Sequence, residues 1–171
     1  MAENERTRMR EREAPKLDSY ELQLRSRAEF QDRQMVGPVV IRSTDREFTV
    51  TRQANLKYYL DPMTYKDTPL QDWLVFINDV KRHSGKHRHQ GGLVIYVIEG
   101  RGYSVVDEER IEWEAGDLLL LPIKPQGVVH QHFNLAPGEP CLWIAFIYMP
   151  IMDAVSMEMT QIEIMPDFKE R

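Results

Sequence analysis

The feature that most constrains the fold is a series of short runs rich in Val, Ile, Leu and aromatic residues in the second half of the chain. Turns containing Gly, Pro, Asp or Glu separate these runs. Short runs at such regular spacing are typical of strands in a sandwich or barrel. The region has no alternation of strand and helix patterns, which disfavours a doubly wound α/β fold. We therefore predict an all-β fold from the runs at residues 73–80, 93–98, 102–107, 110–113, 117–121, 128–133 and 141–148.

The segments on either side of this region have a different composition. Residues 1–17 are rich in Arg and Glu with almost nothing apolar, which predicts a flexible charged tail. Asp18 is a candidate N-cap for an amphipathic helix over residues 19–34, and residues 39–41 and 47–50 resemble short strands. We expect four parts: the tail over 1–17, an N-terminal extension over 18–70, a barrel over 71–150, and a C-terminal arm, helical or extended, over 151–171.

Charge and cysteine content exclude several classes of protein. The net charge of −5 and the pI near 5.6 leave no basic surface of the kind that a phosphate backbone requires, so we expect no nucleic-acid partner. Cys141, the only cysteine, cannot form an internal disulfide. The chain has neither a signal-like start nor an apolar run of the roughly 18 residues of a membrane span. These features predict a cytoplasmic protein that binds no membrane.

The histidines form the strongest candidate site. All of them lie in two clusters after residue 82. In an extended strand, side chains at i and i+2 point to the same face, so His87 and His89 can reach one ion while Arg88 points away. His130 and His132 repeat this spacing on a later run, and a neighbouring strand could bring a third imidazole to the same metal. The alternative is that these histidines lie on the surface beside a turn.

Two motifs in this region resemble those of the cupin superfamily. The first is Gly85-Lys-His87-Arg-His89 followed by Glu99-Gly100-Arg-Gly102, and the second is Gly116-Asp117, then Pro122, then Gly127-Val-Val-His130-Gln-His-Phe-Asn134. The resemblance covers roughly residues 72 to 148. It implies one double-stranded β-helix, the cupin or jelly-roll barrel, with a helical or flexible N-terminal extension. It also implies one divalent metal ion on His87, His89 and His130.

The sequence departs from the cupin pattern at two places. Where the family usually has a metal-binding Glu, this chain reads Gln90-Gly-Gly-Leu93-Val94, so no carboxylate is available. Four residues separate Pro122 from Gly127, which lengthens a loop before His130 and makes His132 a rival third ligand. A site of three histidines is similar to that of the gentisate 1,2-dioxygenase-like cupins and of the diketone-cleaving dioxygenases, although the former are usually two-cupin chains.

This resemblance implies a metal-dependent dioxygenase, an oxidoreductase that uses Fe(II) on a small hydroxylated aromatic acid or a similar chelating substrate. Zn, Mn, Ni and Cu are alternatives for the metal. His132 is a candidate catalytic group, because a neutral imidazole beside His130 can orient a ligand or pass a proton. The alternative is that it is a core histidine. Tyr96, Trp143 and Phe146 are candidates for the substrate pocket, although aromatic residues in strands more often belong to the core.

Two other functions remain open at this stage. The barrel could be a non-oxidative metal enzyme, such as an isomerase, decarboxylase or lyase, or a non-enzymatic module that binds a small molecule. We also expect a homodimer, because edge strands and an apolar arm over residues 151–165 favour pairing with a second copy.

Overall fold

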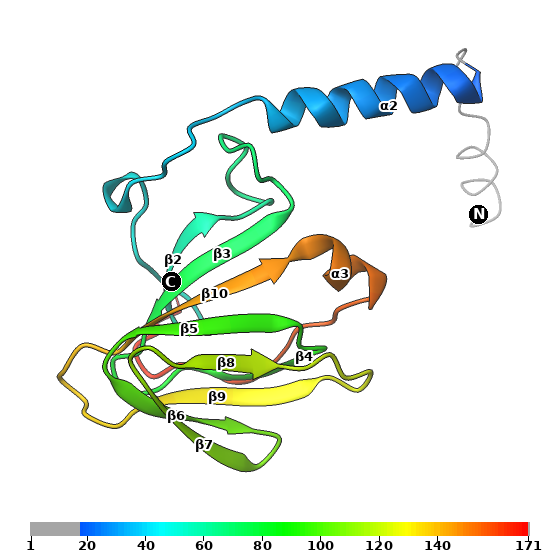
Figure 1. Ribbon diagram of the computed structural model, residues 1–171. Coiled ribbons are helices and arrows are strands. Elements are labelled where there is room, and N and C mark those ends of the chain that lie inside the picture. The colour runs from blue at the N-terminus through cyan, green and yellow to red at the C-terminus, as the bar shows by residue number, and fades with distance from the viewer. Residues whose placement is uncertain (1–17, 171) are drawn as a thin grey trace. The chain divides into compact units, whose positions relative to one another are not determined.

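The computed structural model describes residues 18–170 and separates them into two units, divided between Val36 and Gly37. The first unit contains helix α2, Ser19–Gln34 (Figure 1). The carboxylate of Asp18 accepts a hydrogen bond of 2.8 Å from the backbone N–H of Glu21, which caps the first turn. The expected helix therefore begins at the expected residue. None of its side chains is buried, and the predicted tail over 1–17 lies outside the described residues.

The second unit contains two antiparallel sheets (Figure 1). Within the described residues, the larger sheet has six strands in the order β1 (Thr49–Val50), β2 (Asn55–Leu60), β3 (Trp73–Asp79), β10 (Leu142–Tyr148), β5 (Leu93–Glu99) and β8 (Leu118–Leu121). The smaller sheet has five strands in the order β11 (Thr160–Glu163), β4 (Lys86–His89), β9 (Val128–Asn134), β6 (Arg101–Val106) and β7 (Glu109–Glu114).

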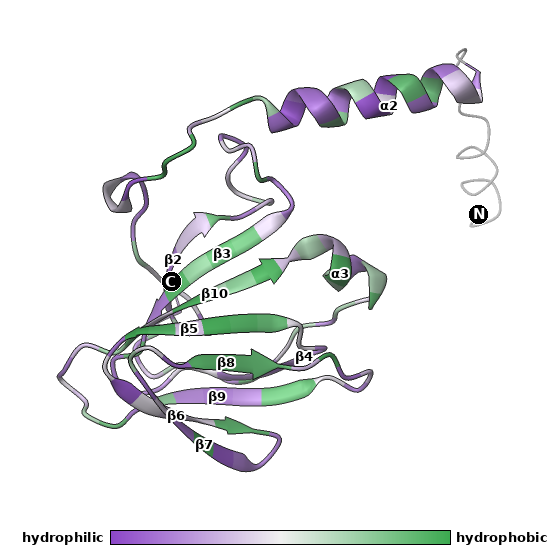
Figure 2. Cartoon of the chain, in the orientation of Figure 1, coloured by the Kyte–Doolittle hydropathy of each residue, from purple (hydrophilic) through white to green (hydrophobic). Residues whose placement is uncertain are grey.

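The hydrophobic core is formed mainly by the inner face of the six-stranded sheet. Successive side chains of a strand point to opposite faces, and in β5 the side chains of Leu93, Ile95 and Val97 are buried while their neighbours are exposed. Trp143 and Ala145 of β10 alternate in the same way. Figure 2 shows hydrophobic colouring along β5 and β8, whereas β7 carries both hydrophilic and hydrophobic colouring. The expected all-β fold with an N-terminal helix is confirmed.

The structure differs from the sequence-based expectations outside the barrel region. Residues 39–41 form no strand, and in the segment 47–50 only Thr49–Val50 is extended into β1. Val39 and Val40 are both exposed, so burial does not stabilise a strand there. The C-terminal segment contains both of the expected conformations, because helix α3, Met149–Ala154, precedes β11.

Strands from the flanking segments complete both sheets. β2, from the predicted extension, pairs with β3, and β11, from the predicted arm, pairs with β4. The division at residues 70 and 150 stays a prediction. β4, β2 and β11 lay outside the seven expected runs, because β4 is short and polar and the other two carry mixed side chains.

Candidate metal centre

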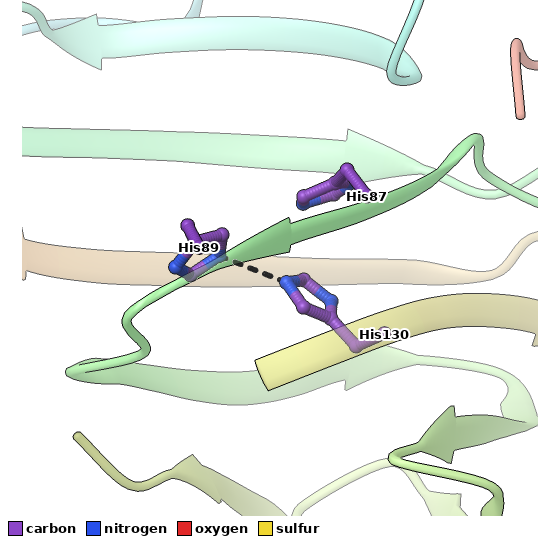
Figure 3. A group of neighbouring side chains, drawn as sticks. All are labelled: His87, His89 and His130. Atoms are coloured by element: carbon purple, nitrogen blue, oxygen red, sulfur yellow. Dashed lines mark hydrogen bonds between the residues drawn. The ribbon is translucent and has the colours of Figure 1, made fainter. Parts of the chain in front are cut away.

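Three histidines meet between β4 and β9 on the inner face of the five-stranded sheet. His87 and His130 are directly paired across the ladder, and His89 follows His87 on the same face of β4 (Figure 3). One ligand atom from each ring lies within 4.8 Å of those of the other two. The ring of His130 is 4.2 Å from that of His87 and 4.9 Å from that of His89, measured between centroids. Arg88 points to the exposed outer face, as the alternation predicts.

All three rings are buried, and this holds them in the neutral form. Burial, followed by repulsion from His89, lowers the pKa of His87 to about 4. Burial likewise lowers the pKa of His89 to about 4. The pKa of His130 lies well below its usual value because of burial and then the neighbouring imidazoles. Neutral imidazole is the form that binds a metal ion, so near neutral pH no proton needs to be removed from a cationic ring.

The hydrogen bonds among the rings define their tautomers. The backbone N–H of Gly91 donates to Nδ1 of His89 over 3.0 Å, so the neutral His89 ring carries its proton on Nε2. That Nε2 lies 2.8 Å from Nε2 of His130, which accepts the proton (Figure 3). Gly91 has a φ of +86°, and a Cβ there would collide with the carbonyl of Pro122, so the turn that brings this donor back to His89 requires glycine.

His132 lies behind His130 and outside the group of three. Its Nε2 is 3.1 Å from Nδ1 of His130, and its Nδ1 is 2.7 Å from the hydroxyl oxygen of Ser104. Trp113 Nε1–H donates to the same oxygen over 2.9 Å. Since Nε2 of His130 accepts from His89, its Nδ1 donates to His132, and His132 in turn donates to Ser104. Burial lowers the pKa of His132 to about 3, so this chain is made of neutral rings.

The donor set fits a divalent metal ion of the transition series. Three buried neutral imidazoles converge, and Nδ1 of His87 is buried with no hydrogen-bond partner among residues 18–170. Imidazole nitrogen is a common ligand of Fe, Zn, Cu, Ni and Mn. A metal ion on Nε2 of His89 would displace the proton now donated to His130. The residues present could therefore hold one ion, with the donor set His87, His89 and His130.

The histidines lie at one side of a cavity between the two sheets. The space inside the cavity that the centre of a water-sized sphere can occupy is about 90 Å³. Apolar side chains form most of its wall, and no Asp, Glu, Lys or Arg of the described segment lines it. Leu93, in the stretch where the cupin pattern usually has a glutamate, is part of this wall. Its other apolar members include Leu56, Leu74, Phe76, Ile147 and Met157.

The three aromatic candidates for the pocket are placed differently. Trp143 lines the cavity and is 3% exposed, whereas Tyr96 is 44% exposed and Phe146 is 37% exposed, both outside the cavity. The expectation for Tyr96 and Phe146 is therefore corrected: the strand pleat directs both to the outer face of the six-stranded sheet.

Ser104 and Asn78 are polar residues near the site that the sequence analysis missed. A polar residue at an inward position of an otherwise apolar strand was the available signal for Asn78.

The comparison with family models identifies the fold. A model described as a cupin domain matches residues 75–147, which extend from β3 to β10 and contain all three histidines. This segment of the chain is a cupin domain. No curated protein matches the chain.

Several solved structures are similar to this chain. Salicylate 1,2-dioxygenase from Pseudoaminobacter salicylatoxidans, solved with gentisate adducts, is 21% identical with a TM-score of 0.50, over 78% of this chain and 35% of that one. A variant of PAC13 from Streptomyces, solved with uridine, is 14% identical with a TM-score of 0.52, over 75% and 93%. A cupin-like protein from Thermotoga maritima is 18% identical with a TM-score of 0.50, over 76% and 92%.

These likenesses define the fold of the chain and not its reaction. The chain spans about a third of the length of the salicylate 1,2-dioxygenase chains. In the part of the chain that the structure describes, no helix is both long and apolar enough to cross a membrane.

Proposed function

We propose that this chain is a metal-dependent cupin enzyme in which His87, His89 and His130 hold Fe(II). We further propose that it is a dioxygenase acting on a small hydroxylated aromatic acid or a similar chelating substrate. One observation carries the proposal: three buried, neutral imidazoles converge at the side of an apolar cavity that no carboxylate of the described residues lines. A site with three protein ligands leaves coordination positions for a substrate.

The charge of the site favours an anionic chelating group. Three neutral ligands would leave the ion with its full charge of +2. The lining of the cavity contains neither Lys nor Arg among the described residues, so the ion itself would be the partner for a phenolate or carboxylate oxygen. When bound, Fe(II) would pass electrons from the chelated substrate to dioxygen. Both oxygen atoms would enter the product and one carbon–carbon bond of the substrate would break, so the substrate supplies all four electrons and no further reductant is needed.

The other residues of the site orient groups and exclude water. Nδ1 of His130 donates to His132, which holds the His130 ring at a defined angle, as partners of metal-binding histidines commonly do. Ser104 accepts from His132 and holds that ring in turn. The apolar side chains of the six-stranded sheet exclude water from the reacting end, which strengthens every electrostatic interaction there.

The decisive experiment measures dioxygen uptake after metal loading. The protein is loaded with Fe(II) under argon, freed of excess metal, and mixed with gentisate in oxygenated buffer. We expect one dioxygen consumed per gentisate. Loading with Zn in place of Fe should abolish the uptake while the ion remains bound, because Zn has no redox chemistry.

Two other results would replace this proposal. Turnover that needs metal but no dioxygen would identify an isomerase, decarboxylase or lyase. Tight binding of small molecules with no product would identify a non-enzymatic binding module.

We also propose that the chain forms a homodimer through the outer face of its six-stranded sheet. Exposed apolar side chains lie side by side there, since Val94 of β5 pairs with Leu120 of β8, and Tyr96 pairs with Leu118. Figure 2 shows β5 and β8 as strongly hydrophobic strands. Large exposed apolar patches mark interaction sites, and one patch that pairs with itself gives a closed two-fold assembly.

Light scattering would test this pairing. We expect a dimer for the unmodified protein and a monomer for Leu120→Lys. Glu112→Lys is the matched control, because it places the same side chain on the exposed face of β7 in the other sheet, and it should stay dimeric. A monomeric unmodified protein would contradict the proposal.

A further inference from the structure

Two buried polar atoms in the apolar wall of the cavity have no hydrogen-bond partner among the described residues. They are the carboxamide oxygen Oδ1 of Asn78 and the indole Nε1–H of Trp143. Asn78 is 2% exposed and Trp143 is 3% exposed, and both line the cavity. Leaving such an atom buried and unpaired costs about 1 to 3 kcal/mol. The cavity is the place from which a partner for these atoms can come.

The two residues are neighbours across the ladder. Asn78 of β3 and Trp143 of β10 are directly paired in register, and side chains that are paired in this way start roughly 5 Å apart on one face of the sheet. One atom is an acceptor and the other is a donor. A hydroxyl group satisfies both at once, because its O–H can donate to Oδ1 while its oxygen accepts from Nε1–H.

The ring of His132 lies between Trp143 and His130 in the wall of the cavity. The ring of Trp143 is 4.8 Å from that of His132, which is 5.1 Å from that of His130, measured between centroids. On its other side Trp143 packs against Phe76, 6.0 Å away. One imidazole ring of the wall therefore separates the pair from His130, and we take a ligand that spans both to have a body of at least one ring.

We propose that Asn78 and Trp143 form a second polar anchor that binds a hydroxyl group of the substrate, remote from the atoms that chelate the metal. The anchor selects a neutral group, since no Lys or Arg of the described chain lines the cavity to compensate a second negative charge. The substrate class is then a small ring with a chelating end and an uncharged hydroxyl at the far end. This inference deepens the proposed function and rests on it only in taking this cavity as the substrate site.

The test uses phenol and toluene, which differ by the hydroxyl and need no metal. Titration of the 171-residue protein with each is followed in ¹H–¹⁵N spectra, where each Trp gives one indole resonance. Phenol should shift the Trp143 Nε1–H resonance more than toluene does, and should bind about three to ten times more tightly, as one net hydrogen bond provides. The Trp113 indole is an internal control, because its Nε1–H is already bonded to Ser104, and it should not respond to the hydroxyl.

Two variants test the anchor independently. Trp143→Phe removes the donor and keeps an aromatic ring, and Asn78→Leu removes the acceptor at similar volume. Either variant should lower the ratio of the two affinities, because each removes one of the two hydrogen bonds to the hydroxyl of phenol. A variant that does not fold leaves the spectra of the unmodified protein as the deciding measurement.

Three results would overturn the anchor: no binding of phenol, equal binding of phenol and toluene, or a Trp143 resonance that both shift equally. A preference for phenol that is undiminished in both variants would do the same, because the hydroxyl would then bind elsewhere. Failure of the proposed function is separate, because it would appear as absent dioxygen uptake with gentisate while the preference for phenol persists.

Discussion

The two sheets of the barrel differ in what their inner faces contribute. The five-stranded sheet presents buried polar groups, namely the histidines of β4 and β9 and the hydroxyl of Ser104 on β6. Hydrogen bonds connect His89, His130, His132 and Ser104 among them. The six-stranded sheet presents Ile95, Val97 and Ala145, which contribute by burial alone. One sheet therefore supplies the donor atoms of the candidate metal centre, and the other supplies the dry wall that faces them. The Asn78–Trp143 pair is an exception within this apolar wall, because its two unpartnered polar atoms are buried there.

Metal content gives the largest effect that this comparison predicts. His87→Ala removes one of three ligands, so we expect bound metal to fall from about one ion per chain to near zero, as measured by elemental analysis of protein purified without chelator. His83→Ala is the matched control, because His83 lies outside the group of three, and it should keep its metal. Unchanged metal content in His87→Ala would contradict the assignment of His87 as a metal ligand.

The buried histidines of the five-stranded sheet should make the free energy of unfolding depend on pH. Burial lowers the pKa of His87 and His89 to about 4 and that of His132 to about 3, whereas an unfolded imidazole titrates near 6.5. Between these values the unfolded chain binds more protons than the folded chain. The free energy of unfolding of metal-free protein should therefore be constant above about pH 7 and fall as the pH is lowered from 6.5 towards 4.

Thermal unfolding at a series of pH values would measure this loss. His87→Ala, which has one buried ring fewer, should show a shallower dependence. Equal slopes for the two proteins would show that the imidazoles do not cause it.

At neutral pH, the free energy of unfolding should instead depend mainly on the buried apolar side chains of the six-stranded sheet. Ile95 is completely buried, so Ile95→Ala should lower the free energy of unfolding by about 2 to 5 kcal/mol in urea denaturation. The adjacent Val94 points to the outer face of the same strand, and Val94→Ala should cost about 0.5 kcal/mol. Similar losses for the two variants would contradict the assignment of inner and outer faces. Both should retain their metal.

The smallest expected effect comes from the hydroxyl behind the histidines. Ser104→Ala removes the acceptor of His132 and should weaken metal binding about tenfold to a hundredfold, because the ring that orients His130 is then no longer held in place itself. A competition titration with a metal-binding dye would measure it. Ser19→Ala, on the exposed helix α2, is the control. Unaltered affinity in Ser104→Ala would mean that His130 is oriented by packing alone.

Much of the barrel could be predicted from local patterns. Three of these patterns depend only on residues within one turn or strand. They are the alternation of buried and exposed side chains in β5, the common face of His87 and His89, and the start of α2 at Asp18. The same alternation could have excluded Tyr96, since it lies between the inward residues Ile95 and Val97. The short strands β4 and β11 were missed because they have too few apolar side chains and obtain their order from the strands beside them.

By itself the sequence determined which residue types are available: two histidine pairs with a common face, a stretch without a carboxylate, and strands with one apolar side. Only the tertiary structure decided that His87 lies opposite His130 and that His132 lies behind it. It also placed Asn78 beside Trp143, 65 positions away in the numbering. The physical reason is the distance along the chain over which each feature is determined. Strand alternation is a property of neighbouring residues, whereas the register of a ladder depends on how the whole barrel closes around its core.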